Sequence, residues 1–267
     1  MGMKRIKKII CIIIGLLLLL GIIALGINLW VEYGIEKSNP QSYETIGDIP
    51  TPEGFKRING DDADYGNFLR SLPLKPKGSV IKYYWGGIAD LQELNYAVVD
   101  LPLLSNAEQC ADVCMRLRAE YLYQAGRTKD IHFMDVQGNL LKYDGEESRE
   151  SFEKYLRHVF DVANTYSLRK EMEKRDLERI QPGDVFVYPA NSSQYGHAVM
   201  VADVAEDGNG YLAVLLVEGY LPARSIHVMN NWQDPKNSPW FILDGESDEI
   251  TFSAFQFSVD DLRCFPK

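Results

Sequence analysis

The hydrophobic positions divide this chain of 267 residues into one long apolar run near its start and shorter, periodic segments after it. The long run extends from Ile9 to Trp30 and is interrupted only by Asn28, and a helix needs about 20 such residues to cross a bilayer. Four basic residues precede the run and none follows closely, which is typical of a helix whose N-terminus stays inside the cell. We therefore predict that residues 1–30 cross the cytoplasmic membrane once, as an anchor, with the C-terminal part on the extracytoplasmic side.

A cleaved signal peptide is the alternative interpretation of the same run. Small residues at Ala24-Leu25-Gly26 stand where a signal peptidase would cut, but the run is longer than the core of an ordinary signal peptide. Residues 31–52 are polar and rich in turn formers, so they are predicted to be a spacer. Residues 53–267 are then expected to form a single globular domain.

The strongest strand signal lies between Ile180 and Val204, where two β-rich runs flank a short polar loop. The second run begins at His197, directly after Gly196, and continues with small apolar residues on both of its faces. Such a continuous run is typical of a strand that is buried on both sides. A third strand is predicted from Tyr211 to Tyr220, so the three segments are expected to form an antiparallel sheet.

The turn between the last two strands decides which side chain faces His197. A two-residue turn at Asp207-Gly208 would place Glu218 directly opposite His197. A turn at Gly208-Asn209 would pair His197 with Tyr220 and leave Glu218 diagonal to it on the same face. A loop of odd length would place Glu218 on the other face and separate the two side chains.

The clearest helical segment extends from Ser105 to Tyr123. Ser105 and Glu108 have the spacing of a capping box, and good helix formers follow. This boundary places Cys110 about one turn inside the helix, on a predicted buried face shared with Cys114, Leu117 and Tyr121. Two more helices are predicted over residues 150–163 and 167–180, and together with the strands they indicate an α+β fold.

The composition excludes some partners. The chain has 28 basic and 38 acidic residues, and the predicted extracytoplasmic part, which lacks the four basic residues of the leader, carries a net charge of −14. Such a balance argues against nucleic acid and acidic polymers as partners. Three cysteines lie outside the apolar run (Cys110, Cys114 and Cys264), which is no dense disulfide framework, and their odd number leaves at least one free thiol or an intermolecular bond.

Three side chains could together perform nucleophilic chemistry. A thiol near the start of a helix can be activated by an imidazole, and the imidazole needs a partner that orients its other nitrogen. Cys110, His197 and Glu218 could fill these roles in that order. The alternative is that Cys110 is a core residue, since free cysteine is among the most buried residue types.

Other polar residues are further candidates. Arg70 is a structural ion pair or a ligand contact, and Asp100, near the end of a predicted strand, could pair with it or with a catalytic base. A metal site made of Cys110, Cys114 and His197 would lack an evident fourth ligand, so neither a metal nor another cofactor is expected. A sugar-binding module that uses the tryptophans is a further alternative, although such residues more often pack than bind.

Two resemblances bear on function. The segments Ile180-Gln181-Pro182-Gly183-Asp184-Val185-Phe186-Val187 and Gly196-His197-Ala198-Val199-Met200-Val201 resemble the central part of papain-like cell-wall amidases and peptidases of the NlpC and CHAP type. In those enzymes a nucleophilic cysteine at the start of a helix precedes the catalytic histidine, as Cys110 precedes His197. From Gly54 to Phe265 the chain also resembles an uncharacterised family of bacterial exported proteins, through motifs that include Gln109-Cys110-Ala111-Asp112. The second resemblance implies no activity.

The sequence therefore predicts an α+β domain of papain-like fold, with a central antiparallel sheet packed against the cysteine-bearing helix. The expected function is that of a membrane-anchored cysteine hydrolase acting on amide bonds, with cell-wall peptides as candidate substrates. Cys110, His197 and Glu218 are its predicted catalytic residues, and Arg70, Asp100 and Gln109 are substrate-binding or structural candidates. The alternative is a non-catalytic binding or scaffold domain, in which Cys110 would be buried behind Leu117 and Tyr121.

Overall fold

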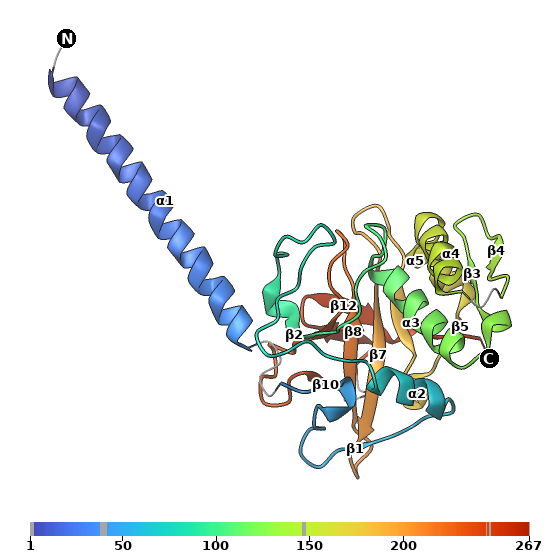
Figure 1. Cartoon of the computed structure of the whole chain (residues 1–267). Helices are drawn as coiled ribbons and strands as arrows, with labels where there is room; N and C mark the ends of the chain where they lie inside the picture. The colour runs from blue at the N-terminus through green and yellow to red at the C-terminus, as the bar shows by residue number, and fades with distance from the viewer. Residues whose placement is uncertain (1–2, 38–41, 146–147, 244, 246, 267) are drawn as a thin grey trace.

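The computed structural model describes residues 3–37, 42–145, 148–243, 245 and 247–266. The α-helices in this part of the chain are α1 (Met3–Lys37), α2 (Ala63–Arg70), α3 (Cys110–Gln124), α4 (Arg149–Val162) and α5 (Thr165–Glu171). Short 3-10 helices are η1 (Ile46–Asp48), η2 (Gln92–Leu94), η3 (Thr128–Asp130), η4 (Leu177–Arg179) and η5 (Val259–Asp261). The domain that follows α1 is an α+β fold, as predicted (Figure 1).

A large antiparallel sheet forms the centre of the domain. Its strands run in the order β2 (Asn95–Val98), β9 (His227–Met229), β8 (Leu212–Glu218), β7 (His197–Glu206), β6 (Val185–Tyr188), β13 (Leu262–Cys264) and β5 (Glu173–Lys174). Two more strands pair with central strands of this sheet, β1 (Lys56–Arg57) with β7 and β10 (Trp240–Leu243) with β8. Separate hairpins are formed by β3 (His132–Met134) with β4 (Leu140–Lys142) and by β11 (Glu249–Phe252) with β12 (Phe255–Ser258).

The central strands are buried on both faces, which explains their apolar sequences. Alternate residues of β7, such as Ala198 and Met200, belong to the larger core cluster, which also contains the inner residues of α2 and α3. The residues between them, such as Val199 and Val201, pack in a second cluster with Phe252 and other side chains of the β11–β12 hairpin. The sheet therefore lies between a helical layer and a β-hairpin.

Helix α3 is buried on every side instead of on one stripe. Every residue from Cys110 to Leu122 is buried, including Arg116 and Glu120, which the sequence places on a different face from the cysteines. Arg116 Nη1 lies 2.6 Å from Glu108 Oε1, and both side chains are almost inaccessible to water. Arg149 of α4 forms two further hydrogen bonds with Glu120. Ion pairs allow this charged helix to occupy the core.

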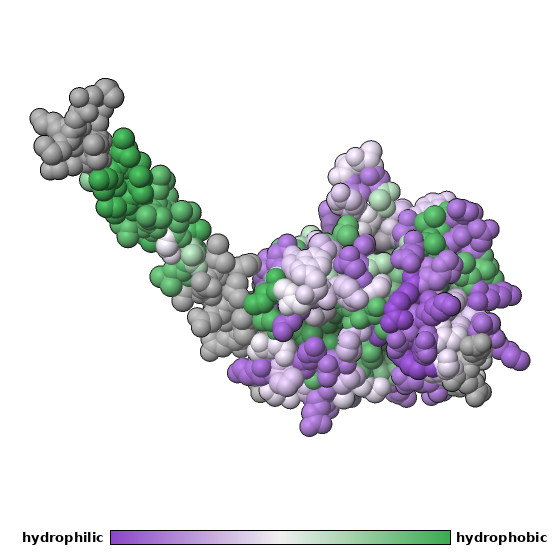
Figure 2. Space-filling model, turned by 45° about the horizontal axis from the view of Figure 1, so that its top comes forward, coloured by the Kyte–Doolittle hydropathy of each residue, from purple (hydrophilic) through white to green (hydrophobic). Residues whose placement is uncertain are grey.

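The N-terminal part differs from the predicted division at residues 30 and 52. Helix α1 continues to Lys37, and its segment Lys8–Gly26 is exposed, long and apolar enough to cross a membrane. Figure 2 shows this segment as a continuous hydrophobic surface, beside a domain whose surface is mostly polar. In the predicted spacer, Ile46 and Ile49 are buried in the larger core cluster, because η1 packs beside α2. The packed part of the domain therefore begins before residue 53.

Candidate active site

Cys110 is the first residue of α3, so the predicted helix start at Ser105 is wrong. Gln109 is the N-cap residue, and its backbone N–H donates to Asp112 Oδ2 at 2.9 Å. The first N–H groups of a helix have no acceptor within it, and their dipoles favour negative charge nearby. Cys110 therefore lies in the first turn of the helix, where a thiolate receives the most stabilisation.

The capping box predicted at Ser105 has another role. The Ser105 hydroxyl accepts from the Ala107 backbone N–H at 3.2 Å, in a turn that precedes the helix. Glu108 accepts from the Leu104 backbone N–H at 2.6 Å and pairs with Arg116. These contacts keep the segment before Cys110 out of the helix and fix its approach to the sheet.

His197 and Glu218 are in contact, although by a register other than the direct pairing. His197 Nε2 lies 2.9 Å from Glu218 Oε2, and both side chains are buried. The loop between Glu206 and Leu212 has five residues, an odd length that would separate the two side chains. A β-bulge between Val201 and Asp203 shifts the register by one residue and returns Glu218 to the face of His197.

Glu218 has a second histidine partner that sequence reasoning missed. His227 stands directly opposite Glu218 in the β8–β9 pair, and its Nε2 lies 3.1 Å from Glu218 Oε1. Both side chains are completely buried. The only sequence signal is the pairing of two short β segments across residues 219–226, a connection too long and irregular to be recognised as a hairpin. The carboxyl group of Glu218 thus lies between two imidazoles.

The ionisation of this group follows from its contacts. Burial lowers the pKa of His197, but interactions with the side chains of Cys110 and Glu218 outweigh it and raise that pKa well above its usual range. Burial likewise raises the pKa of Glu218, but hydrogen bonding to His197 and the charge of His227 hold it well below its usual range. The geometry therefore favours a carboxylate at Glu218 and an imidazole that keeps a proton readily.

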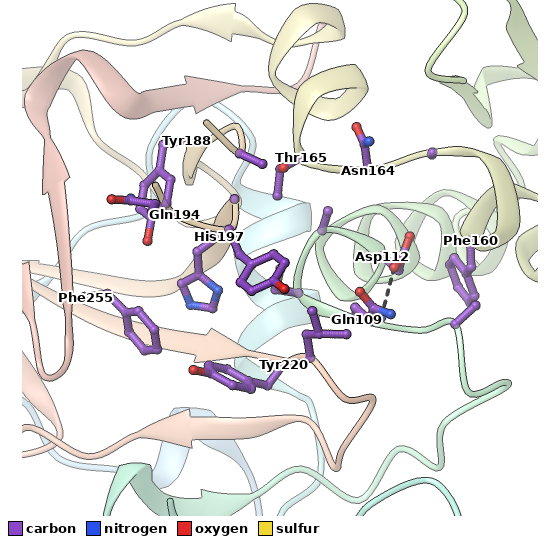
Figure 3. A pocket seen from close by; sticks show the side chains of 18 of the residues that line it. Gln109, Asp112, Phe160, Asn164, Thr165, Tyr188, Gln194, His197, Tyr220 and Phe255 are labelled. Atoms are coloured by element: carbon purple, nitrogen blue, oxygen red, sulfur yellow. Dashed lines mark hydrogen bonds between the residues drawn. The ribbon is translucent and has the colours of Figure 1, made fainter. Parts of the chain in front are cut away.

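A cavity of about 930 Å³ opens over Cys110 and His197. Figure 3 shows His197 beside Phe255 and Tyr220, with Gln109 and Asp112 on the α3 side of the cavity. The His197 ring stacks on Phe255 at a centroid distance of 4.1 Å, which fixes the plane of the imidazole. None of the described residues that line the cavity is a lysine or an arginine. Its walls suit a ligand with amide groups and apolar surface.

Gly219, directly after β8, packs closely against the start of α3. A β-carbon at this position would lie 2.6 Å from Val113 Cγ2 and 3.2 Å from the Gln109 carbonyl oxygen. The Gly219→Ala variant is therefore expected to displace the start of α3 and to lose about 1–3 kcal/mol of unfolding free energy by overpacking. Chemical denaturation measures this loss, and Gly208→Ala is the control, since a β-carbon there meets nothing within 4 Å. Equal stability of the two variants would contradict the predicted crowding.

The remaining candidates take separate places. Gln109 lines the cavity, but Arg70 lies elsewhere, where its Nε donates to Asp203 Oδ1 at 2.7 Å. Arg57 binds the other oxygen of the fully buried Asp203, so this cluster has a structural role. Asp100 is exposed and lies 3.8 Å from Lys75, so it is not the partner of Arg70. Among the described residues, no group of three or more histidine, cysteine, aspartate or glutamate side chains is arranged to hold a metal ion.

Comparison with known protein families places the whole domain in one of them. The family described as Domain of unknown function (4846) matches residues 47–145 and 143–264. The chain belongs to this family. The match covers α3 and the strands that carry His197, Glu218 and His227, so the candidate site lies within the family domain.

The family membership agrees with the resemblance to uncharacterised exported proteins that the sequence motifs indicate. No curated protein and no solved structure matches the chain. The comparisons give no support to the local resemblance to papain-like amidases. The family description itself names no activity, so function has to be argued from the geometry of the site.

Proposed function

We propose that this protein is a cysteine hydrolase of amide bonds with a papain-like arrangement, held at the membrane by α1. One observation carries the proposal: Cys110 begins α3 and interacts with His197, whose Nε2 is bound to Glu218, and both Cys110 and His197 line one cavity. Since Nε2 faces Glu218, the Nδ1 atom of His197 is the nitrogen left for the thiol. Cys110 is then the nucleophile, His197 the base and Glu218 the group that orients the base.

The reaction follows from these roles. The Cys110 sulfur attacks the carbonyl carbon of the amide while His197 takes the thiol proton, and the same proton then passes to the leaving amine. Water next attacks the thioester, His197 accepts a proton from it, and the acid leaves as the thiol is restored. The negative oxygen that forms in each step is stabilised by N–H groups at the start of α3, and the Gln109 amide is placed to help.

The substrate we propose is a peptide of the cell wall. The cavity contains amide side chains from Gln109, Asn164 and Gln194, which can bind peptide groups. Helix α1 supports a location outside the cytoplasmic membrane, because its apolar segment suits either an anchor or a signal sequence. The alternative, a non-catalytic scaffold, would leave the thiol enclosed by Leu117 and Tyr121, whereas Cys110 contributes to the cavity wall.

The rate of thiol alkylation at Cys110 across pH tests this proposal. A thiol of ordinary pKa is only about 3% ionised at pH 7, so an imidazole-activated Cys110 should react at least about tenfold faster than such a thiol. His197→Ala should remove this advantage. Peptide mass analysis separates Cys110 from the other three cysteines. Labelling only after unfolding would show a core cysteine and end the hydrolase proposal.

A further inference from the structure

His227 is a buried titratable side chain that contacts the site but that the proposed reaction does not use. It belongs to β9, between β2 and β8, and is inaccessible to water. Its Nε2 and Glu218 Oε1 lie 3.1 Å apart, and neither atom has a hydrogen-bond partner among the described residues. Burying two such polar atoms face to face is costly unless a proton is shared between them.

The other ring nitrogen decides where that proton is held. His227 Nδ1 lies 3.1 Å from the Ser225 carbonyl oxygen, which can only accept, so Nδ1 carries a hydrogen. In a neutral ring, Nε2 would then point a lone pair at Glu218, and this would repel a carboxylate. Because Glu218 also accepts from His197, the arrangement is satisfied when His227 is an imidazolium and Glu218 is ionised.

Among the described residues, the other group whose positive charge acts on Glu218 is His197. From α3, the Cys110 and Cys114 thiols face this region, and both are acceptors or neutral groups. Tyr220 follows β8 and feels the Glu218 charge. Arg224 Nη2 is engaged by Asp90 at 2.8 Å, and its guanidinium lies over the Tyr220 ring. From β2, the residue paired with His227 is the apolar Val98.

We infer that His227 is a positioning residue of this site: as a buried imidazolium it holds Glu218 in place and sets the pH range in which the Cys110–His197 pair reacts. The inference rests on the proposed hydrolase function. With His227 charged, the four groups carry no net charge either as thiol and imidazole or as thiolate and imidazolium. The proton can therefore move from Cys110 to His197 without leaving an uncompensated charge in the core.

Removing the positive charge of His227 should shift the pH dependence of Cys110 alkylation in one direction. A nearby cation stabilises the Cys110 thiolate and disfavours protonation of His197. The variant His227→Gln keeps an N–H that can reach Glu218 but is neutral. The alkylation rate of Cys110 changes with pH as the Cys110 thiol and the His197 ring lose their protons. In the variant, both of these changes should move to higher pH by about one unit.

The first test measures the protonation of the His227 ring by NMR. The full chain contains four histidines, so selective ¹⁵N-histidine labelling in detergent micelles gives few signals, which single His→Gln variants assign. Both nitrogens of His227 should be protonated at pH 7. A neutral His227 ring would overturn the inference. Because this measurement needs no catalysis, it can succeed even if Cys110 proves unreactive and the hydrolase proposal fails.

The second test compares alkylation profiles of matched variants. His158→Gln is the control, because His158 is exposed on α4 and should leave the profile unchanged. His227→Asn keeps a donor for the Ser225 carbonyl but is too short to reach Glu218, so it should shift the profile like His227→Gln and also slow alkylation at its optimum. Loss of stability in the His227 variants without any pH shift would mean that His227 only fills the core.

Discussion

Hydrolysis of cell-wall peptides should fall by at least about a thousandfold in Cys110→Ala, because no other group at the site can form the thioester. The folded state should persist, since Cys110 lies at the cavity wall and its removal leaves the ion pairs of α3 intact. Product release from peptidoglycan fragments, followed by mass spectrometry, measures the loss. Thermal unfolding of the same sample establishes that the variant is folded.

The matched control for this variant is Cys264→Ala. Cys264 lies in β13, is only partly buried and does not line the cavity. Its removal should leave turnover unchanged and so separates the loss of a nucleophile from the loss of any thiol. Activity retained in Cys110→Ala would end the hydrolase assignment and leave the scaffold alternative.

Glu218→Ala should reduce the free energy of unfolding by about 3–5 kcal/mol, because it leaves two buried imidazoles without their shared carboxylate. The alkylation rate of Cys110 should fall with it, since His197 loses the group that orients its ring. Urea unfolding of the full chain in micelles measures the stability. A loss below about 1 kcal/mol would contradict the buried His–Glu–His arrangement.

The same comparison has a characteristic pH dependence. The pKa of Glu218 is lowered in the fold, so its contribution is present above the ordinary carboxyl value of about 4.3 and is lost as pH falls through the lowered value. The pKa of His197 is raised, so its contribution is complete below about 6.5 and is lost as pH rises through the raised value. The stability difference between wild type and Glu218→Ala should therefore be largest between about pH 4.3 and 6.5. A difference independent of pH would contradict these shifts.

The sequence was a better guide to which residues belong to the candidate site than to how they are arranged. Strand periodicity and the glycine before His197 located the hairpin, but the predicted two-residue turn is a five-residue loop, and by count alone such a loop would place Glu218 on the other face. The predicted direct pairing of His197 with Glu218 was wrong. The two side chains share a face because a bulge near Asp203 compensates for the five-residue loop. A bulge leaves little trace in a run of small apolar residues.

The start of α3 was predicted wrongly because a local sequence signal has another use in the fold. Ser105 and Glu108 have the spacing of a capping box, but Glu108 is used by Arg116 and by the chain before the helix. Only tertiary packing decides between these uses, so the position of Cys110 in the first turn could not be derived from the sequence. His227 was missed for a similar reason, since its pairing with Glu218 depends on a long connection between β8 and β9.

The position of η1 has a consequence for where an anchored domain could act. Helix α1 ends at Lys37 and the core begins at Ile46, so at most eight residues connect them. A fully extended chain of that length spans about 28 Å, and the part of α1 beyond Gly26 adds about 16 Å. If α1 stays in the membrane as an anchor, the cavity over Cys110 would therefore remain within a short distance of the membrane surface.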